Sequence, residues 1–521
     1  MEHQPCISEK RFPLFFAVFI VLHFSVWVIL PLLTKPNYPL DVIEGFIYGQ
    51  KWVLSSGKHP PLPAWIMSLV FQGTGKAEVT PYLCSQIIVC LAFFAIWKIS
   101  RQMLSPPRAL FAVCVMEFYT YFTFYSLEFN NSITLLGCWS LAALAFFLTL
   151  QSDGKLRYWI LTGVFLGLGV LAKYSGFILV FMMLLYMVRD PVARRYWKTP
   201  GPYLTTLVAA AVFLPHFIDV VSHHFSTLQY LTERVEGKTY DFTEHFTCPI
   251  IFMLNQSGII AAILVAFYLF NGRIIQKRAL SESEKQFARF LNMLVLWPLI
   301  FQLLISTAFG LRLDTIYGSH LWIFLGLYLA LFLEMDEKFL TLRRIALFAM
   351  AGIILMATLT AVRDVASPYL RDKPSRIHYP GKEIAHQIEA LWHTKYDYPC
   401  PHLVGEWWLT GNVVAYGNDA PQVFCYSNPD ALNKKLVLSI WTDSDSINRE
   451  GGICLWDIHH YREKIPPNLL KNFPTAEILP VIRIPYSTRA NLAPLELGVA
   501  IIPPHHLDHT SNRNVTETHS P

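Results

Sequence analysis

Repeated apolar segments constrain the fold of this chain more than any other feature. A helix needs about 20 apolar residues to cross a bilayer, and this 521-residue chain is 53% hydrophobic and only 15% charged. We predict eleven spans. The stretch 157–188 is either one long tilted helix or two short spans, and Lys173 favours two, because lysine is costly at the bilayer midplane. The predicted spans lie at 13–33, 79–99, 107–127, 132–150, 157–171, 175–188, 202–221, 248–270, 290–309, 319–334 and 345–362.

The distribution of basic residues predicts the orientation of these spans. Segments on the amino-terminal side of the membrane carry more than twice as many Lys and Arg residues as those on the other side. The positive-inside rule then places the N-terminus in the cytoplasm, and an odd number of spans places the C-terminus outside. The first apolar run is too long for a cleaved signal peptide and is typical of an anchor. The net charge of +5, without a Lys/Arg block, argues against a nucleic-acid partner.

The composition changes near residue 363, where spanning segments end and short apolar runs begin to alternate with prolines. We predict an amphipathic helix at 381–392. Short buried strands are predicted at 403–405, 413–416, 423–426 and 453–456. The sequence therefore predicts a polytopic all-α membrane domain over 1–362, an extracytoplasmic α/β domain over 363–505, and a disordered polar tail over 506–521.

The nine cysteines lack C-x-x-C spacing, which argues against a structural zinc site or a redox motif. Cys400, Cys425 and Cys454 fall in the outer domain. In an oxidising compartment two of them could pair, or all three could remain buried thiols.

Two acids follow the first span directly. Asp41 and Glu44 are three residues apart, and Tyr48 lies four residues further on, so a helix places all three on one face. We expect this helix to continue to a stop at Gly57, and a second apolar helix to begin near residue 62 after a proline turn. The acids either carry chemistry at the bilayer rim or merely favour the positive N-terminus of their helix.

The string that follows resembles a family motif. Lys58-His59-Pro60-Pro61-Leu62 and Ala64-Trp65 are similar to the "KHPPL-AW" string in the first outer loop of bacterial GT-C membrane glycosyltransferases. The closest resemblance is to family 39, which includes protein O-mannosyltransferases and the aminoarabinose transferase acting on lipid A. Members carry their catalytic acid on the preceding helix, usually as an Asp-Glu dipeptide. The resemblance implies that Asp41 and Glu44, here in a D-x-x-E form, are catalytic, and that Tyr48, Lys58 and His59 contact substrate.

The second outer loop contains Glu128, Asn130 and Asn131. Related enzymes carry an "FN-N" string here, so the resemblance implies contacts to sugar hydroxyls. The alternative for the asparagines is capping of the next helix, a role these side chains favour. No cap requires Glu128, and for it we favour a substrate role.

A third outward turn, Lys173-Tyr174-Ser175, resembles the "K-Y-[ST]" turn of this family. The resemblance implies that Lys173 binds a lipid-linked phosphate as a point charge, with Tyr174 beside it. Snorkelling of Lys173 to the headgroups is the alternative. Arg312, in the last outward turn, is a second candidate for the phosphate.

The resemblance implies transfer of a sugar from a polyprenyl-phosphate donor to a glycolipid, glycan or protein acceptor at the periplasmic face of a bacterial inner membrane. Asp41 would deprotonate the acceptor hydroxyl, and the anomeric centre would invert through an oxocarbenium-like transition state. The scheme requires no cofactor, although a divalent metal is compatible with it. A transporter or flippase for a lipid-linked glycan would carry charges near the midplane and an internal repeat. A non-catalytic envelope assembly factor would leave the candidate residues as surface features.

Overall fold

The structure is a computed structural model that divides into two compact units. The first comprises the described residues of Met1–Thr34, His59–Phe225 and Leu231–Val365, and the second those of Lys35–Lys58 and Ala366–Pro521. The described residues are 11–50, 52–55, 58–75, 77–222, 241–272, 276–370, 375–425, 442–460, 465–466, 468–486 and 493–505. The predicted tail over 506–521 lies outside them.

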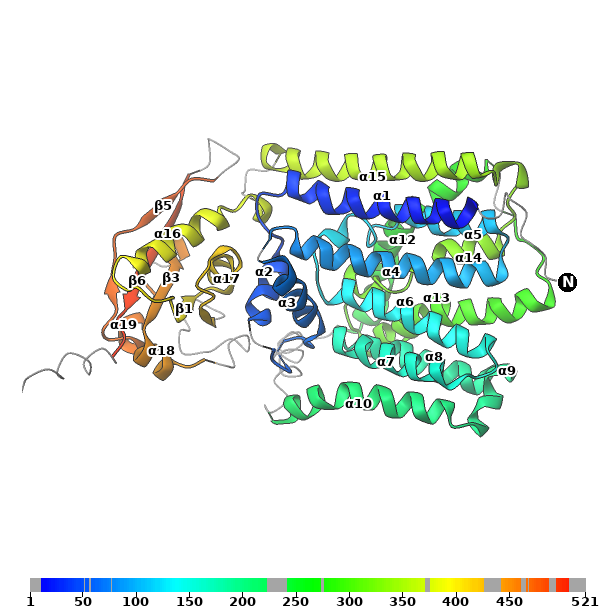
Figure 1. The fold of residues 1–521 in the computed structure, drawn as a ribbon, viewed down its shortest axis with the longest axis horizontal. Coiled ribbons are helices and arrows are strands. Elements are labelled where there is room, and N and C mark those ends of the chain that lie inside the picture. Colours follow the sequence, from blue (N-terminus) through cyan, green and yellow to red (C-terminus); the bar gives the residue numbers. More distant parts are fainter. Residues whose placement is uncertain are drawn as a thin grey trace, which may run out of the picture. The chain divides into compact units, whose positions relative to one another are not determined.

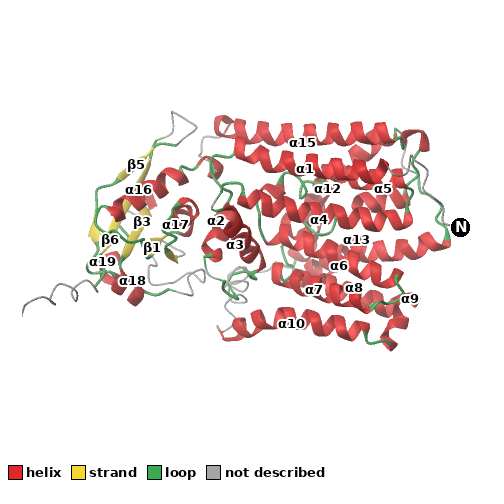
Figure 2. Ribbon diagram, in the orientation of Figure 1, coloured by secondary structure: helices red, strands yellow, loops and turns green. Residues whose placement is uncertain are grey.

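The first unit is helical, and its long helices run alongside one another (Figures 1 and 2). Within the described residues, seven helices are long and apolar enough to cross a bilayer, and an eighth candidate is bent by 87° after Arg189. The seven are α1 (Arg11–Thr34), α4 (Thr80–Met103), α6 (Asn131–Gln151), α10 (Gly201–Ser222), α12 (Glu244–Asn271), α13 (Glu282–Phe309) and α15 (Leu342–Leu370). The chain is therefore a multi-pass membrane protein, but the predicted count of eleven spans is not confirmed.

The stretch 157–188 forms two helices rather than one. α7 (Leu156–Ala172) and α8 (Gly176–Arg189) are separated by a turn that contains Lys173, as the cost of a mid-membrane lysine predicts. α7 also packs closely against α10: a Cβ on Gly163 would lie 2.6 Å from the Thr205 carbonyl oxygen. Small residues at such positions let membrane helices approach each other without a gap.

Two predicted spans, 107–127 and 319–334, are not continuous helices. In the first, α5 (Pro106–Cys114) passes into a 3₁₀ turn over Val115–Phe118 and then into turns. In the second, only α14 (Leu325–Phe332) is α-helical. The two segments bond to each other, since the Tyr119 hydroxyl donates to the Ser319 carbonyl at 2.6 Å. Irregular backbone at membrane depth is tolerated where protein buries it, so an apolar run did not suffice to predict a span.

The second unit is built on a six-stranded mixed sheet. The order along the sheet is β2-β1-β3-β6-β4, with β5 paired to β6. β1, β2 and β3 are parallel, and β6 runs antiparallel to its neighbours. The strands are β1 (His402–Gly405), β2 (Gln422–Cys425), β3 (Gly452–Asp457), β4 (Glu477–Ile478), β5 (Ile482–Ile484) and β6 (Leu495–Ile502).

Four helices pack around this sheet: α16 (Gly381–His393), α17 (Trp407–Tyr416), α18 (Ser444–Glu450) and α19 (Leu469–Asn472). Ile447 of α18 and Leu469 of α19 join a buried cluster with Trp456 of β3. The predicted helix at 381–392 and three of the four predicted strands are present. The strand predicted at 413–416 is wrong, because these residues form the last turns of α17. A short apolar run fits a buried helix as well as a strand.

The acid-bearing helix α2 (Leu40–Gly49) belongs to this second unit. It packs on α17 so closely that a Cβ on Gly411 would lie 2.6 Å from Cγ2 of Ile43. Tyr38, just before α2, stacks on Tyr416 with ring centroids 4.8 Å apart. The helix ends at Gly49, so the prediction that it extends to Gly57 is wrong. α3 (Leu62–Thr74) begins where the second apolar helix is predicted.

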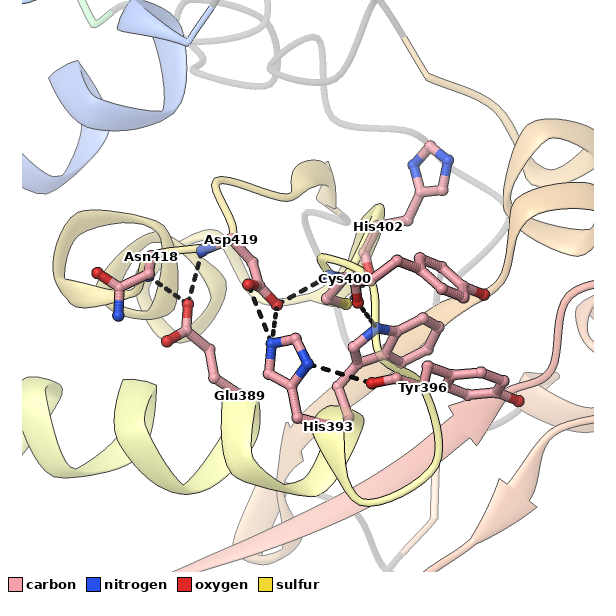
Figure 3. A network of polar contacts seen from close by, with 9 residues as sticks. Glu389, His393, Tyr396, Cys400, His402, Asn418 and Asp419 are labelled. Carbon is pink, nitrogen blue, oxygen red and sulfur yellow. Dashed lines mark hydrogen bonds and ion pairs between the residues drawn. The ribbon is translucent and has the colours of Figure 1, made fainter.

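A polar network holds the amino ends of β1 and β2 (Figure 3). Glu389 accepts hydrogen bonds from the backbone N–H groups of Asn418 and Asp419. The Asp419 carboxylate in turn accepts from the Cys400 N–H at 2.8 Å and lies 3.1 Å from His393 Nε2. These bonds join α16 to the loops that precede β1 and β2.

The three cysteines of the second unit are all thiols. Within the described residues, Cys400, Cys425 and Cys454 form no disulfide.

Candidate functional site

The acids of α2 form a cluster with two neighbours. Glu44 is only 5% exposed. Its carboxylate accepts a hydrogen bond from the Tyr48 hydroxyl at 2.9 Å and forms an ion pair with Lys58 Nζ at 2.7 Å. Asp41 lies in the first turn of the same helix and is half-buried. The structure thus brings Tyr48 and Lys58 to Glu44, and Asp41 lies on the same short helix as Glu44 and Tyr48. We call Asp41, Glu44, Tyr48 and Lys58 the α2 cluster.

Burial dominates the electrostatics of Glu44. It raises the pKa of the Glu44 carboxyl above its ordinary value, and the negative charge of Asp41 raises it further. The Lys58 charge and the hydrogen bonds from Lys58 and Tyr48 oppose this rise without cancelling it. A buried carboxyl with a raised pKa, held by a cation and a hydroxyl, is typical of functional sites, although structural ion pairs produce it too.

Lys58 also contacts a residue that sequence reasoning missed. Its ammonium group lies 5.9 Å from the ring centroid of Trp407, the first residue of α17. Cations within about 6 Å of an indole face are attracted by its quadrupole. Trp407 lies 349 residues further along the chain, and no local signal in the sequence indicates the contact.

A second cluster lies in the first unit, at the start of α6. Asn130 caps the helix, since its side chain accepts from the backbone N–H groups of Ser132 and Ile133 at 2.9 and 3.1 Å. Asn131 donates to the Ala172 carbonyl oxygen at 2.7 Å. Lys173 donates to the Ser132 hydroxyl at 2.9 Å. We call Asn130, Asn131, Ser132 and Lys173 the α6 cluster.

The environment of the K-Y-S turn combines aromatic and polar groups. The Lys173 ammonium group lies 4.8 Å from the centroid of the Tyr317 ring. The Tyr174 hydroxyl lies 3.0 Å from Nε2 of His216, a buried residue of α10. Sequence reasoning missed His216 and Tyr317 as partners of this turn, since they come from distant segments.

The remaining candidates lie in loops. His59 and Glu128 are half-buried. Arg312 is exposed, in the loop that follows α13. Among the described residues there is no group of three or more His, Cys, Asp or Glu side chains arranged to hold a metal ion.

Comparison with known proteins shows what this chain resembles. Residues 58–218 match the family model described as dolichyl-phosphate-mannose-protein mannosyltransferase. The chain is 22% identical over 452 residues to the lipopolysaccharide core galacturonosyltransferase RgtB of Rhizobium johnstonii. The matched residues make up 83% of this chain and 88% of that protein. The chain is therefore similar in sequence to membrane glycosyltransferases of the GT-C type.

Solved structures show the same fold. ArnT from Cupriavidus metallidurans bound to undecaprenyl phosphate superposes with a TM-score of 0.58 at 14% identity. The apo form of that protein gives a TM-score of 0.50. Each match covers 94% of this chain and 97% of the other. The fold shared with ArnT therefore extends over the membrane spans and the C-terminal sheet, and the chain matches that structure along nearly its whole length.

Proposed function

We propose that this protein is a glycosyltransferase that takes a sugar from a polyprenyl-phosphate donor and transfers it to an acceptor at the periplasmic face of a bacterial inner membrane. The observation that carries the proposal is the α2 cluster, in which a half-buried Asp41 and a buried, ion-paired Glu44 share a short helix. The lipid-linked donor is supported by the fold shared with ArnT, whose solved structure holds undecaprenyl phosphate. Nucleotide sugars are not supplied outside the cytoplasm, and a lipid carrier meets that need.

In the proposed reaction, Asp41 removes the proton from an acceptor hydroxyl. The acceptor oxygen forms a bond to the anomeric carbon, and the bond from that carbon to the donor phosphate breaks. The electron pair of the broken bond leaves with the phosphate, and the anomeric centre inverts. Lys173, with Arg312 as a second candidate, stabilises the departing phosphate, so the reaction needs no metal.

Glu44 and Lys58 act in this scheme as positioning residues for Asp41. Both Glu44 oxygens have donors within the cluster, because the Tyr48 hydroxyl and the Lys58 ammonium bond to the carboxylate. The role of base is assigned to Asp41, as the resemblance of this helix to the acid-bearing helix of the family implies. The acceptor is a glycolipid such as lipid A, a glycan, or a protein.

A transfer assay with the full-length protein in proteoliposomes tests the proposal. Polyprenyl phosphates carrying labelled galacturonic acid, aminoarabinose or mannose are offered with lipopolysaccharide or a Ser/Thr-rich peptide. Label should move from one of the donors to an acceptor. Transport of an intact donor across the vesicle membrane without transfer would contradict the proposal and support a flippase.

Reporter fusions test the location. A reporter that is active only in the periplasm should be active after Leu370, at the end of α15, and silent after Leu280, before α13. The reason is the excess of Lys and Arg on the amino-terminal side. The reverse pattern would place α2 and the C-terminal unit in the cytoplasm.

A further inference from the structure

The carboxyl ends of β1 and β3 lie at a topological switch point of the sheet. The connection from β1 leads through α17 to β2 on one side, while β3 is followed in the sheet by β6 on the other side. The two connections leave in opposite directions, and open α/β sheets bind ligands outside the carboxyl ends of strands at such a point. The strand order β2-β1-β3 alone thus marks one edge of this sheet.

Polar side chains gather at that edge. Glu406 directly follows β1, Asp457 ends β3, and His460 lies in the turn after β3. Nδ1 of His460 lies 2.7 Å from a carboxylate oxygen of Glu406, which ties the two strand ends together. The side chains of Glu406 and His460 remain 26% and 50% exposed. Glu406 is also the N-cap residue of α17, but its side chain makes no capping bond.

Four half-buried aromatic side chains line the same edge. Trp407 and Trp408 form the first turn of α17, with ring centroids 6.3 Å apart. Trp408 packs on Tyr379 at 5.4 Å, and Tyr379 lies 6.4 Å from Tyr486, just after β5. β5 and β3 both pair antiparallel with β6, so their carboxyl ends point to one edge. We call Trp407, Trp408, Tyr379 and Tyr486 the aromatic row.

The acids lie close to this row. Burial raises the pKa of the Tyr379 phenol, and the charges of Tyr486, Asp457 and Glu406 raise it further. The other end of the row reaches the α2 cluster, because Lys58 contacts the Trp407 ring and the Glu44 carboxylate. A surface of aromatic faces and carboxylates is therefore continuous, within one unit, with the candidate catalytic acids.

We propose that the aromatic row, together with Glu406, Asp457 and His460, binds a sugar residue of a glycan acceptor. This inference rests on the proposed function and names the substrate class of its acceptor. The axial C–H groups of a sugar ring carry partial positive charge, which suits the negative face of an indole. Carboxylates and an imidazole bond the ring hydroxyls. A few polar groups placed beside apolar walls fix the orientation of a small ligand.

Binding is measured by isothermal titration calorimetry on the full-length protein in nanodiscs, without donor. The probe is the delipidated core oligosaccharide of lipopolysaccharide, and a Ser/Thr-rich peptide is titrated separately. The oligosaccharide should bind, and Trp407→Ala with Trp408→Ala should weaken it about tenfold or more. Tyr396→Ala is the control, because Tyr396 is a half-buried aromatic residue at the opposite end of β1.

Glu406→Gln and His460→Gln test the same site if the double tryptophan variant fails to fold. Both side chains are partly exposed and lie outside the core, so these substitutions should leave the fold intact. Each should weaken oligosaccharide binding severalfold at an unchanged Tm. The inference is overturned if the oligosaccharide does not bind, if these variants bind it as the wild type does, or if the peptide alone binds.

The two proposals fail separately. Binding of the oligosaccharide without any sugar transfer would contradict the proposed function and still support the binding site. Sugar transfer with an unchanged acceptor KM in the Glu406 and His460 variants would support the proposed function and contradict the binding site.

Discussion

The acid and lysine of the α2 cluster and the asparagines of the α6 cluster use their polar side chains in opposite ways. On α2, side chains bond side chains: Glu44 accepts from Tyr48 and from Lys58. At the start of α6, Asn130 and Asn131 bond backbone groups of the helix end and of the neighbouring turn. Bonds between side chains can be exchanged for bonds to a substrate, whereas loss of a backbone cap weakens the helix itself. We therefore expect the chemistry at α2 and structural support from the asparagines.

The largest effect is expected from Asp41→Asn. Asparagine keeps the shape of aspartate but does not accept a proton at neutral pH, and positioned general bases contribute about 10²–10⁴-fold. Turnover in the proteoliposome assay should fall at least about a hundredfold, with donor binding and Tm close to wild type. Asp445→Asn is a matched control, since Asp445 is an exposed acid in the first turn of α18 in the same unit. Wild-type turnover in Asp41→Asn would move the role of base to Glu44.

Lys173→Ala should have the next largest effect. Hydrogen bonds to charged groups contribute about 1.5–3 kcal/mol, which corresponds to a loss of about ten- to a hundredfold in donor kcat/KM. Lys173→Arg should retain part of the activity.

Lys98→Ala is the control, because Lys98 also lies over an aromatic ring, at 5.5 Å from Phe94, on the membrane helix α4. Equal donor kinetics in the two alanine variants would assign Lys173 to the lipid headgroups instead.

Glu44→Gln should lower turnover less, by about tenfold or below. It should also change the pH dependence of turnover. The pKa of Glu44 is raised, chiefly by burial. Protonation therefore begins at a higher pH than for an ordinary glutamate, and it removes the charge that holds Lys58. Turnover of the wild type should fall as the pH drops through this raised value.

In Glu44→Gln this decline of turnover should be absent, because glutamine does not titrate. Glu383→Gln, an exposed acid in the first turn of α16, should leave the profile unchanged. An identical acid limb in Glu44→Gln and wild type would remove Glu44 from the site.

The contrast between the clusters also explains what the sequence can predict. Helix spacing was enough to place Asp41, Glu44 and Tyr48 on one short helix, because that geometry is local. The helix ends at Gly49, and the contacts of Lys58 with Glu44 and Trp407 arise from tertiary packing. Hydropathy predicted most helices of the first unit, but failed at Val115–Phe118, which forms a 3₁₀ turn. The residue that follows this turn, Tyr119, donates its side-chain hydroxyl to the Ser319 carbonyl of another segment. The strand ends that bring Glu406 and His460 together depend on the sheet order, which no local pattern encodes.

Asn130→Ala should have the smallest effect on catalysis and a clear effect on stability. Removing an asparagine cap costs about 1 kcal/mol, because the backbone N–H groups of Ser132 and Ile133 lose their acceptor. The midpoint of unfolding in detergent should fall, while kcat and the donor KM remain within about twofold of wild type. Asn130→Asp keeps the accepting oxygen and should restore the midpoint, and Asp443→Ala removes a comparable cap, from α18, in the second unit. A large loss of kcat at an unchanged midpoint would show that Asn130 touches the substrate, and Asn130 would then take part in the chemistry together with Lys173.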